Sequence, residues 1–425
     1  MTQHRNIVIL GASFGGIQSA QYISKHLLPV LNAKHTTHYH LYIINPSADF
    51  FFRNASPRTA VSTTRLPTEN ILVPLSEIFA PLPKSDFTFI QASASGLDTA
   101  ARTVSYRRTD DGKNHAEEEK LEYHALIIAT GTRTHHPAFS LLSTETTKSA
   151  IEATNQAIAT AKSIIVSGGG PTGVETAAEI GEHVNGKPGW FSTPTRKVPV
   201  TLITAADQLL PTLRPSIAKE AERKLKALGV DVVYNTRVEN AVEGKDGRKT
   251  IVLELSNGEN LQTDVYIPAH GVLPNSSYLP RALLTPTSYL STNPLTLRVD
   301  VAGPRVYALG DISSASRNTL IELNEMMPVL FTNLKRDLFS FNPADPGKKA
   351  PGKDREYKKI EKEMLGVSVG SAGGVGAVFG WRIPSWVVWL LKSRDMMSGN
   401  GVKWTREGKN VAKEFLWKGE EVVVL

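Results

Sequence analysis

The amino-acid sequence predicts an α/β protein of two or three domains, and three observations support this prediction. The chain has 425 residues, which is more than one typical domain. Short apolar runs rich in β-branched residues alternate with stretches of helical apolar spacing, as in parallel sheets covered by helices. Two of the runs, residues 6–10 and 163–167, lead directly into glycine-rich turns.

The first turn consists of Gly11, Ala12, Ser13, Phe14, Gly15 and Gly16. Gly11 permits a tight turn and Gly16 permits close packing of the next helix, as in turns that hold the pyrophosphate of a dinucleotide. Ser13 replaces the central glycine of that motif, a departure that its small side chain makes tolerable. The next strand, predicted at 39–45, ends in Asn45 instead of the usual acid, so a ribose hydroxyl would be bound without charge.

The second turn has the complete glycine spacing, with Gly168, Gly170 and Gly173. The strand after its helix, predicted at 198–204, ends without an acid or an arginine at residues 204–206. An acid there would repel the 2′-phosphate of NADP, and an arginine would attract it. The sequence therefore predicts that both NADH and NADPH are used.

Two later strand ends complete an ordered set of motifs. They are Ala129, Thr130 and Gly131 for the first, and Gly310 and Asp311 for the second. In chain order the motifs predict that the first turn binds FAD and the second turn binds the NADH or NADPH that reduces it. The predicted fold has two Rossmann-like dinucleotide-binding domains, the FAD domain being split by the NAD(P)H domain, and a small C-terminal α+β domain.

The expected domain limits follow from this order. We expect the FAD domain at 1–145 and 280–335, the NAD(P)H domain at 146–279, and the C-terminal domain at 345–425 against the flavin. Within the C-terminal part, the highly charged residues 348–363 are predicted to be a linker that enters a charged helix.

Composition excludes several kinds of chemistry. The chain contains no cysteine, which excludes disulfides, thiolate metal sites, cysteine nucleophiles and redox-active dithiols. The net charge of +7 would suit nucleic acid or an anionic membrane, but the bases are spread along the chain, as on a solvated surface with sites for anionic cofactors. No metal site is expected, because His35, His38 and His40 lack carboxylate partners nearby.

The N-terminus, MTQHRNIVIL, lacks the layout of a signal peptide, and threonine stands at the second position, where myristoylation requires glycine. No apolar stretch reaches the length of a membrane span. We therefore expect a cytoplasmic protein with at most peripheral membrane contact, for example at a mitochondrial or lipid-droplet surface.

Over nearly its whole length the chain resembles the apoptosis-inducing-factor-like (AIF-like) branch of the two-dinucleotide-binding-domain flavoproteins. The segments that carry the resemblance are FFFRNASPRTAV (50–61), LLPTLRPSIAKEAERKLKALGVDVV (209–233), GVLPNSSYL (271–279) and WLLKSRDMM (389–397). Members of this branch are NAD(P)H:quinone oxidoreductases that contain FAD. The resemblance implies the same cofactors, and a small-molecule acceptor, here.

The resemblance also implies roles for five single residues. Arg58 would be a charge partner of the FAD pyrophosphate, Ala94 would lie by the adenine, and Asp311 would bind hydroxyls at the flavin end. Glu175 would bind the nicotinamide, or serve only as an acid in the first turn of a helix. Lys392 would stabilise reduced flavin near the quinone, or be only a surface lysine.

The predicted activity is a FAD-dependent NAD(P)H oxidoreductase that passes two electrons to a quinone. The apolar run 374–391 is the candidate wall of the quinone pocket, with ordinary core as the alternative. Two other functions stay open: reduction of a protein or another small-molecule acceptor, and a nucleic-acid-binding death effector. Because Glu175 and Lys392 fall in different predicted domains, replacing Lys392 should slow only acceptor reduction, and replacing Glu175 only flavin reduction.

Overall fold

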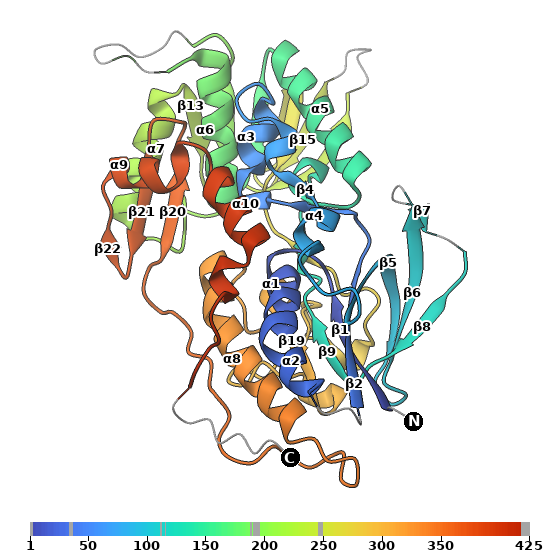
Figure 1. Ribbon diagram of the computed structural model, residues 1–425. Coiled ribbons are helices and arrows are strands. Elements are labelled where there is room, and N and C mark those ends of the chain that lie inside the picture. The colour runs from blue at the N-terminus through green and yellow to red at the C-terminus, as the bar shows by residue number, and fades with distance from the viewer. Residues whose placement is uncertain are drawn as a thin grey trace.

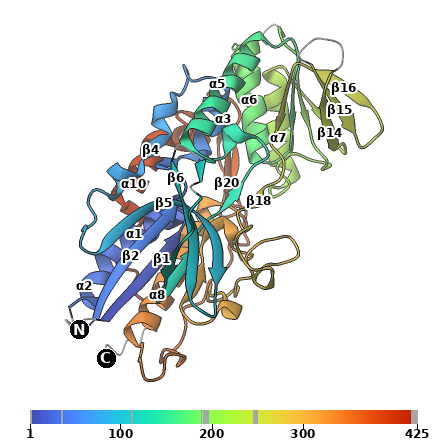
Figure 2. The ribbon, with the colours of Figure 1, turned by 90° about the vertical axis from the view of Figure 1, so that its right-hand side faces the viewer.

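The computed structural model describes residues 3–33, 37–110, 113–114, 116–187, 189, 196–244 and 250–417. Two sheets with parallel cores form the two halves of the molecule, and helices cover both (Figure 1). Figure 2 shows the first sheet at the end near the N-terminus, and the strands β14 (Val238–Glu243), β15 (Ile251–Leu255) and β16 (Asn260–Thr263) at the far end.

The larger sheet has five parallel strands at its core, in the order β19-β9-β1-β2-β5, and β6, β7 and β8 extend it in antiparallel fashion. The strands are β1 (Gln3–Leu10), β2 (Thr37–Asn45), β5 (Phe87–Asp98), β6 (Thr103–Asp110), β7 (Lys113–Asn114), β8 (Glu119–Glu122), β9 (Ala125–Ile128) and β19 (Val306–Ala308). The β-branched run at the end of β1 is fully buried, because both faces of this sheet are covered. The helices α1 (Phe14–Tyr22), α2 (Leu28–Leu31) and α8 (Leu320–Phe339) lie over one face (Figure 1).

The second sheet is parallel throughout, in the order β13-β12-β11-β17. It comprises β11 (Ile164–Ser167), β12 (Val200–Ile203), β13 (Val230–Val233) and β17 (Val265–Pro268), with the helices α5 (Thr144–Thr160), α6 (Pro171–Asn185) and α7 (Pro215–Ala227). The antiparallel strands β14, β15 and β16 pack against it through Leu253 and Leu255. The chain leaves the larger sheet after β9 and returns to it at β19, so the split arrangement predicted from the motif order is confirmed.

The two crossings between the sheets lie side by side. One contains β10 (Thr132–Arg133) and the other contains β18 (Leu273–Pro274), and these strands pair in antiparallel fashion. Between β2 and β5 the chain makes an excursion through β3 (Asp49–Phe51), α3 (Ser56–Val61), β4 (Leu72–Pro74) and α4 (Leu75–Phe79). Helix α3 contacts α5 and α6, so this excursion connects the two halves.

The C-terminal part is a small α+β unit, as predicted. It contains the antiparallel strands β20 (Leu365–Ser368), β21 (Gly374–Val378) and β22 (Trp381–Arg382), followed by α9 (Ser385–Val388), a π-helical turn (Trp389–Ser393) and α10 (Ser398–Glu407). Strand β20 contacts α6 and β21 contacts α7 (Figure 1). Helix α10 contacts α1 and α4 instead, so the C-terminal part touches both halves.

The charged helix predicted within 348–363 is wrong. These residues form no helix and run as an extended strap along α8. Asn333 of α8 binds both backbone groups of Arg355, at 2.8 and 2.9 Å, and Arg336 pairs with Asp354 at 2.7 Å. The bonds from Asn333 satisfy both backbone groups of Arg355 in the extended conformation, and Pro351 and Gly352 oppose a helix at its start.

Candidate functional site

The two glycine-rich turns share one stereochemistry. Gly11 has φ 98° and Gly168 has φ 127°, a region that side chains rarely adopt. A Cβ atom on either residue would lie 2.5 Å from a carbonyl oxygen, that of Ala129 after β9 and that of Ala269 after β17. Each turn therefore passes directly over the end of the neighbouring strand, and only glycine fits.

The last glycine of each turn brings the helix against the turn. A Cβ atom would lie 1.7 Å from the Gly11 oxygen at Gly16, and 1.8 Å from the Gly168 oxygen at Gly173. The positions that the motif assigned to close helix–strand packing thus have no room for a methyl group.

Both helices leave backbone amides available at these turns. The first intrahelical bond of α1 runs from the Ile17 N–H to the Ser13 oxygen (2.9 Å), and that of α6 from Val174 to Gly170 (3.0 Å). The amides before these bonds point from a helix N-terminus, where a pyrophosphate is favoured by both hydrogen bonds and the helix dipole. A Cβ atom on Gly170 would meet no atom of the described residues within 4 Å, so none of them closes this side of the second turn. The residues present fit two dinucleotides.

Three other predicted FAD residues lie at the first turn. Asn45 is buried and braces the turn, because its Oδ1 accepts the Ala12 N–H at 2.9 Å while its Nδ2 donates to the Ser47 oxygen at 2.8 Å. Ser13 is exposed, and Phe14 packs edge-on against Phe50 and Phe52. The amide of Asn45 is therefore engaged with the protein, and a ribose contact would have to share it.

The two later motifs meet at the carboxyl ends of β9 and β19. The Thr132 hydroxyl donates to Asp311 at 3.2 Å, and Arg53 lies 4.0 Å from the same carboxylate oxygen. Burial raises the pKa of Asp311, and the Arg53 charge opposes this shift. Gly131 and Gly310 both have positive φ, 62° and 74°, which turns the chain away from the sheet beside this carboxylate.

The remaining predicted cofactor-binding residues of the larger sheet lie in two different places. Ala129 is buried under Gly11, and the Thr130 hydroxyl donates to the Asn275 oxygen at 3.0 Å. Ala94 lies in β5 opposite Tyr106 of β6 and is half-buried beside the core of the larger sheet. The structure brings Ala129 and Thr130 to the first turn, whereas Ala94 lies in the part of β5 that pairs with the antiparallel strand β6.

Arg58 has a different partner from the one expected. Its guanidinium makes two hydrogen bonds to Glu179 of α6, at 3.0 and 2.7 Å, and donates to the backbone oxygens of Ser393 and Arg394. The side chain is buried, so these bonds occupy it. The assignment of Arg58 to the FAD pyrophosphate stays a prediction, and a pyrophosphate would have to share this guanidinium with Glu179.

Glu175 and Lys392 form a buried ion pair. The Lys392 ammonium lies 2.6 Å from Glu175 Oε1, and the same oxygen accepts the Ser368 N–H at 2.9 Å. Burial raises the pKa of Glu175, and the charge and hydrogen bond of Lys392 oppose that shift. The two residues belong to different parts of the chain, as predicted, but they are in direct contact, and the expectation that they affect separate half-reactions stays a prediction.

Glu175 is one of three buried carboxylates on one face of α6, together with Glu179 and Glu182. Arg65 bridges the second and third, at 3.0 and 2.7 Å, and the Ser371 hydroxyl donates to Glu182 at 2.7 Å. Glu179, Glu182 and Arg65 are not among the residues predicted from the sequence. Their signal was available in the spacing of the acids, because positions i, i+4 and i+7 share one helix face.

The apolar run 374–391 is divided between core and surface. Residues 374–377 of β21 are buried, but Trp381, Trp386 and Leu391 are exposed. The alternative of ordinary core therefore fits residues 374–377 but not the exposed second half, and the role of the run as a wall of the quinone pocket stays a prediction.

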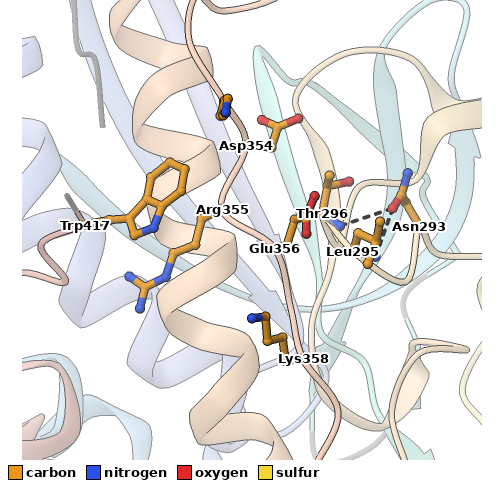
Figure 3. A pocket seen from close by; sticks show the side chains of 9 residues that line it. Asn293, Leu295, Thr296, Asp354, Arg355, Glu356, Lys358 and Trp417 are labelled. Atoms are coloured by element: carbon orange, nitrogen blue, oxygen red, sulfur yellow. Dashed lines mark hydrogen bonds between the residues drawn. The ribbon is translucent and has the colours of Figure 1, made fainter. Parts of the chain in front are cut away.

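A cleft of about 670 Å³ lies away from both turns (Figure 3). Its walls are the loop at 293–296, the strap at 353–358 and Trp417, and Asn293 fixes the loop by accepting the amides of Leu295 and Thr296. None of the predicted site residues lines it. Both signs of charge are present, with Asp354 and Glu356 beside Lys353 and Lys358.

Within the described residues no group of three His, Asp or Glu side chains could hold a metal ion. His35 lies outside those residues, while His38 faces Asp86 at 3.6 Å and His40 binds Thr88 at 2.9 Å. No helix in the described part of the chain is long and apolar enough to cross a membrane.

Comparison with known proteins agrees with this geometry. The chain is 37% identical to "Oxidoreductase phnG" of Penicillium herquei, covering 99% of this chain and 97% of that protein. It is 26% identical to ferroptosis suppressor protein 1 of Mus musculus, covering 95% of this chain and 96% of that protein, which confirms the resemblance to the AIF-like branch.

Among solved structures, the sulfide:quinone oxidoreductase of Aquifex aeolicus has the same fold, with a TM-score of 0.69, 17% identity, and coverage of 97% of this chain and 93% of that one. The family model described as pyridine nucleotide-disulphide oxidoreductase matches residues 5–327. Proteins of this family use FAD and NAD(P)H, and the two turns supply a place for each. The chain belongs to the pyridine nucleotide-disulphide oxidoreductase family.

Proposed function

We propose that this oxidoreductase passes two electrons from NADH or NADPH, through FAD, to a quinone-like acceptor. Names among the related proteins support a quinone, because they include an NADH-ubiquinone oxidoreductase of Saccharomyces cerevisiae and the sulfide:quinone oxidoreductase of similar fold. The first turn would hold FAD and the second the nicotinamide nucleotide. When bound, FAD accepts a hydride and releases electrons to an acceptor.

The observation that carries this proposal is the pair of turns with matching stereochemistry in a chain without cysteine. Two pyrophosphate-binding turns predict two dinucleotides, one of which donates electrons to the other. Without a dithiol, electrons cannot leave through a cysteine pair. They must pass directly to an acceptor that reaches the flavin, as a flat small molecule can.

Residues of the chain would hold and orient the reactants. The backbone amides in the first turns of α1 (Phe14–Gly16) and of α6 (Thr172 and Gly173) would bind the two pyrophosphates. Asp311, beside Thr132 and Arg53, would accept hydroxyl hydrogen bonds at the first site. Glu175 lies two residues after Gly173 in α6 and is paired with Lys392. This ion pair would determine the local charge where the nicotinamide nucleotide meets FAD.

The test is a spectrum followed by an acceptor screen. Purified protein should be yellow, and the released cofactor should be FAD and not FMN. Oxidation of NADH should be fast with a soluble quinone and slow with cytochrome c, ferredoxin or monodehydroascorbate. A colourless protein that cannot be reconstituted with FAD would overturn the proposal at its base.

Two other outcomes would favour one of the alternative functions. The first would change only the proposed acceptor, and the second would change the proposed role of the protein. Fast turnover with a protein acceptor but not with quinones would favour a reductase for that partner. A flavin-free function as a nucleic-acid-binding effector would require DNA affinity that falls steeply with salt. The even spread of basic residues and their many carboxylate partners argue against a continuous DNA-binding surface.

A further inference from the structure

The hairpin and helix at 379–391 expose an unusual amount of apolar surface. Six of the fourteen large apolar side chains that are exposed in the described part of the chain lie here: Phe379, Trp381, Trp386, Trp389, Leu390 and Leu391. Trp381 is 79% exposed and Trp386 is 66% exposed. Isolated exposed apolar residues are ordinary, but a cluster of aromatic ones marks an interaction surface.

The helix in this cluster has its apolar side turned outward. Ser385, Val388 and Lys392 face the interior, where Ser385 binds the Gly374 N–H, Val388 is buried, and Lys392 reaches Glu175. Trp386, Trp389 and Leu390, at positions i, i+3 and i+4, form the opposite face and are exposed. Folding of this chain does not explain two tryptophans and a leucine on the solvent side of a helix.

The tip of the hairpin also carries an apolar residue that faces solvent. Phe379 and Gly380 form the two-residue turn between β21 and β22, and both have positive φ, 51° and 81°. Asparagine, aspartate and glycine suit such a turn, and phenylalanine is strained there. A phenylalanine that is 61% exposed at this tip adds nothing to the core.

Charge indicates the partner. Residues 364–394 contain Arg382, Lys392 and Arg394 and no acid. Arg382 is exposed and has no ion pair among the described residues, and Arg394 only approaches Asp395 at 3.9 Å. Tryptophan prefers the boundary between lipid and water, and arginines beside it are attracted to anionic headgroups.

We propose that the surface formed by residues 379–391, with Arg382 and Arg394 at its edge, docks this protein peripherally on an anionic membrane. The surface lies at the left-hand edge of the molecule in Figure 1, where α9 and β22 are the outermost elements. No helix of the described chain could cross a membrane, so the contact is with one leaflet. This inference does not depend on the identity of the electron acceptor.

The experiment measures partition of the full-length protein to vesicles of phosphatidylcholine with phosphatidylserine, and to phosphatidylcholine alone, by flotation. Wild type should bind the anionic vesicles, and added salt should weaken binding. The variant Trp381→Gln/Trp386→Gln/Trp389→Gln should lose at least about tenfold in partition coefficient. Arg382→Gln/Arg394→Gln should lose the preference for phosphatidylserine while keeping residual binding.

Two variants make the result interpretable. Trp404→Gln removes an exposed tryptophan from α10, which contacts α1 and α4, and should bind as wild type does. Phe379→Asn/Trp381→Gln suits the turn better, so it should fold at least as stably while binding more weakly. The proposal is overturned if wild type binds neither vesicle, if Trp404→Gln loses as much as the triple variant, or if the triple variant abolishes a dimer without changing vesicle binding.

Discussion

His124, which precedes β9, lies among arginines and aromatic rings. Its ring contacts Phe341, with 4.4 Å between ring centroids, and no described residue gives its buried Nε2 a hydrogen-bond partner. Burial lowers the pKa of His124 to about 2, and the charges of Arg305, Arg5 and Arg102 add to this shift. The folded protein therefore holds this imidazole neutral over the whole physiological range.

This predicts acid sensitivity with a defined sign. Below pH 6.5, the ordinary histidine value, the unfolded chain binds a proton at His124 that the folded chain does not. The free energy of unfolding should thus fall as pH drops from about 6.5 toward 4, by up to ~1.4 kcal/mol per pH unit from this group. Urea titrations at several pH values should show a smaller slope for His124→Gln. Equal slopes in wild type and His124→Gln would refute the assignment.

The Glu175–Lys392 pair predicts coupling between distant substitutions. Either Glu175→Gln or Lys392→Met leaves one buried group without its partner, which costs roughly 3–5 kcal/mol for a buried pair. The double variant removes both charges, so it should be more stable than the sum of the two losses predicts. Chemical denaturation of the four proteins measures this. Strict additivity would mean that the pair does not form in solution.

At the scale of elements, both glycine turns could be predicted from the sequence, because each depends on local requirements for a missing Cβ atom. The strap at 348–363 could not, because its Lys- and Glu-rich composition favours a helix while its backbone is bound by Asn333 of α8. The outward-facing tryptophans were also missed. An apolar run shows period and length but not which side of it is covered.

The second turn offers a matched pair of substitutions. Gly173→Ala places a methyl group 1.8 Å from the Gly168 oxygen, so it should destabilise the protein by at least ~1–3 kcal/mol. Gly170→Ala meets no atom and should keep the wild-type melting temperature. Since its methyl group would project toward the open side of the turn, it should still weaken NADH binding. Calorimetry and nucleotide titration separate the two effects; unchanged NADH affinity in Gly170→Ala would place the nucleotide elsewhere.

The end of β12 predicts the choice of nucleotide. Thr204 is buried, its hydroxyl accepts the Ala206 N–H, and no acid stands at 204–206. The Thr236 N–H bonds to the Thr204 oxygen and brings the exposed Arg237 to the same sheet edge. We expect kcat/KM for NADH and NADPH to agree within roughly tenfold, or ~1.4 kcal/mol. Steady-state kinetics with both nucleotides tests this, and a hundredfold preference for either would contradict it.

In the whole molecule, α6 connects the three parts of the chain. Arg58 and Arg65, from the excursion between β2 and β5, bind Glu179, and residues of the C-terminal part bind Glu175 and Glu182. The two members of each pair are more than a hundred residues apart in the sequence; Arg58 and Glu179, for example, are separated by 121 residues. Sequence patterns within a helix show that the acids share a face, but only the tertiary fold determines which cation meets each one.

Because this network is buried, replacing one of its arginines should lower the stability of the protein much more than replacing an arginine of an exposed ion pair. Arg58→Met should cost roughly 3–5 kcal/mol, because Glu179 would stay buried with only Arg65 as its cation. Arg223→Met removes an exposed pair with Glu220 and should cost about 0–1 kcal/mol. Thermal and urea unfolding of both variants provides the comparison. Equal losses would show that the network does not hold the parts together.

The pairing of β10 with β18 has a mechanical consequence. Because the two crossings run side by side as a hydrogen-bonded ribbon, the second half of the molecule is attached by a double strand and not by two independent tethers. The ribbon does not act alone, because α3 and the C-terminal part also contact both halves, so any opening of the two halves would have to break those contacts as well. A protease that cut one crossing would leave the halves attached through the other, and the nicked protein would still migrate as one particle until it was denatured.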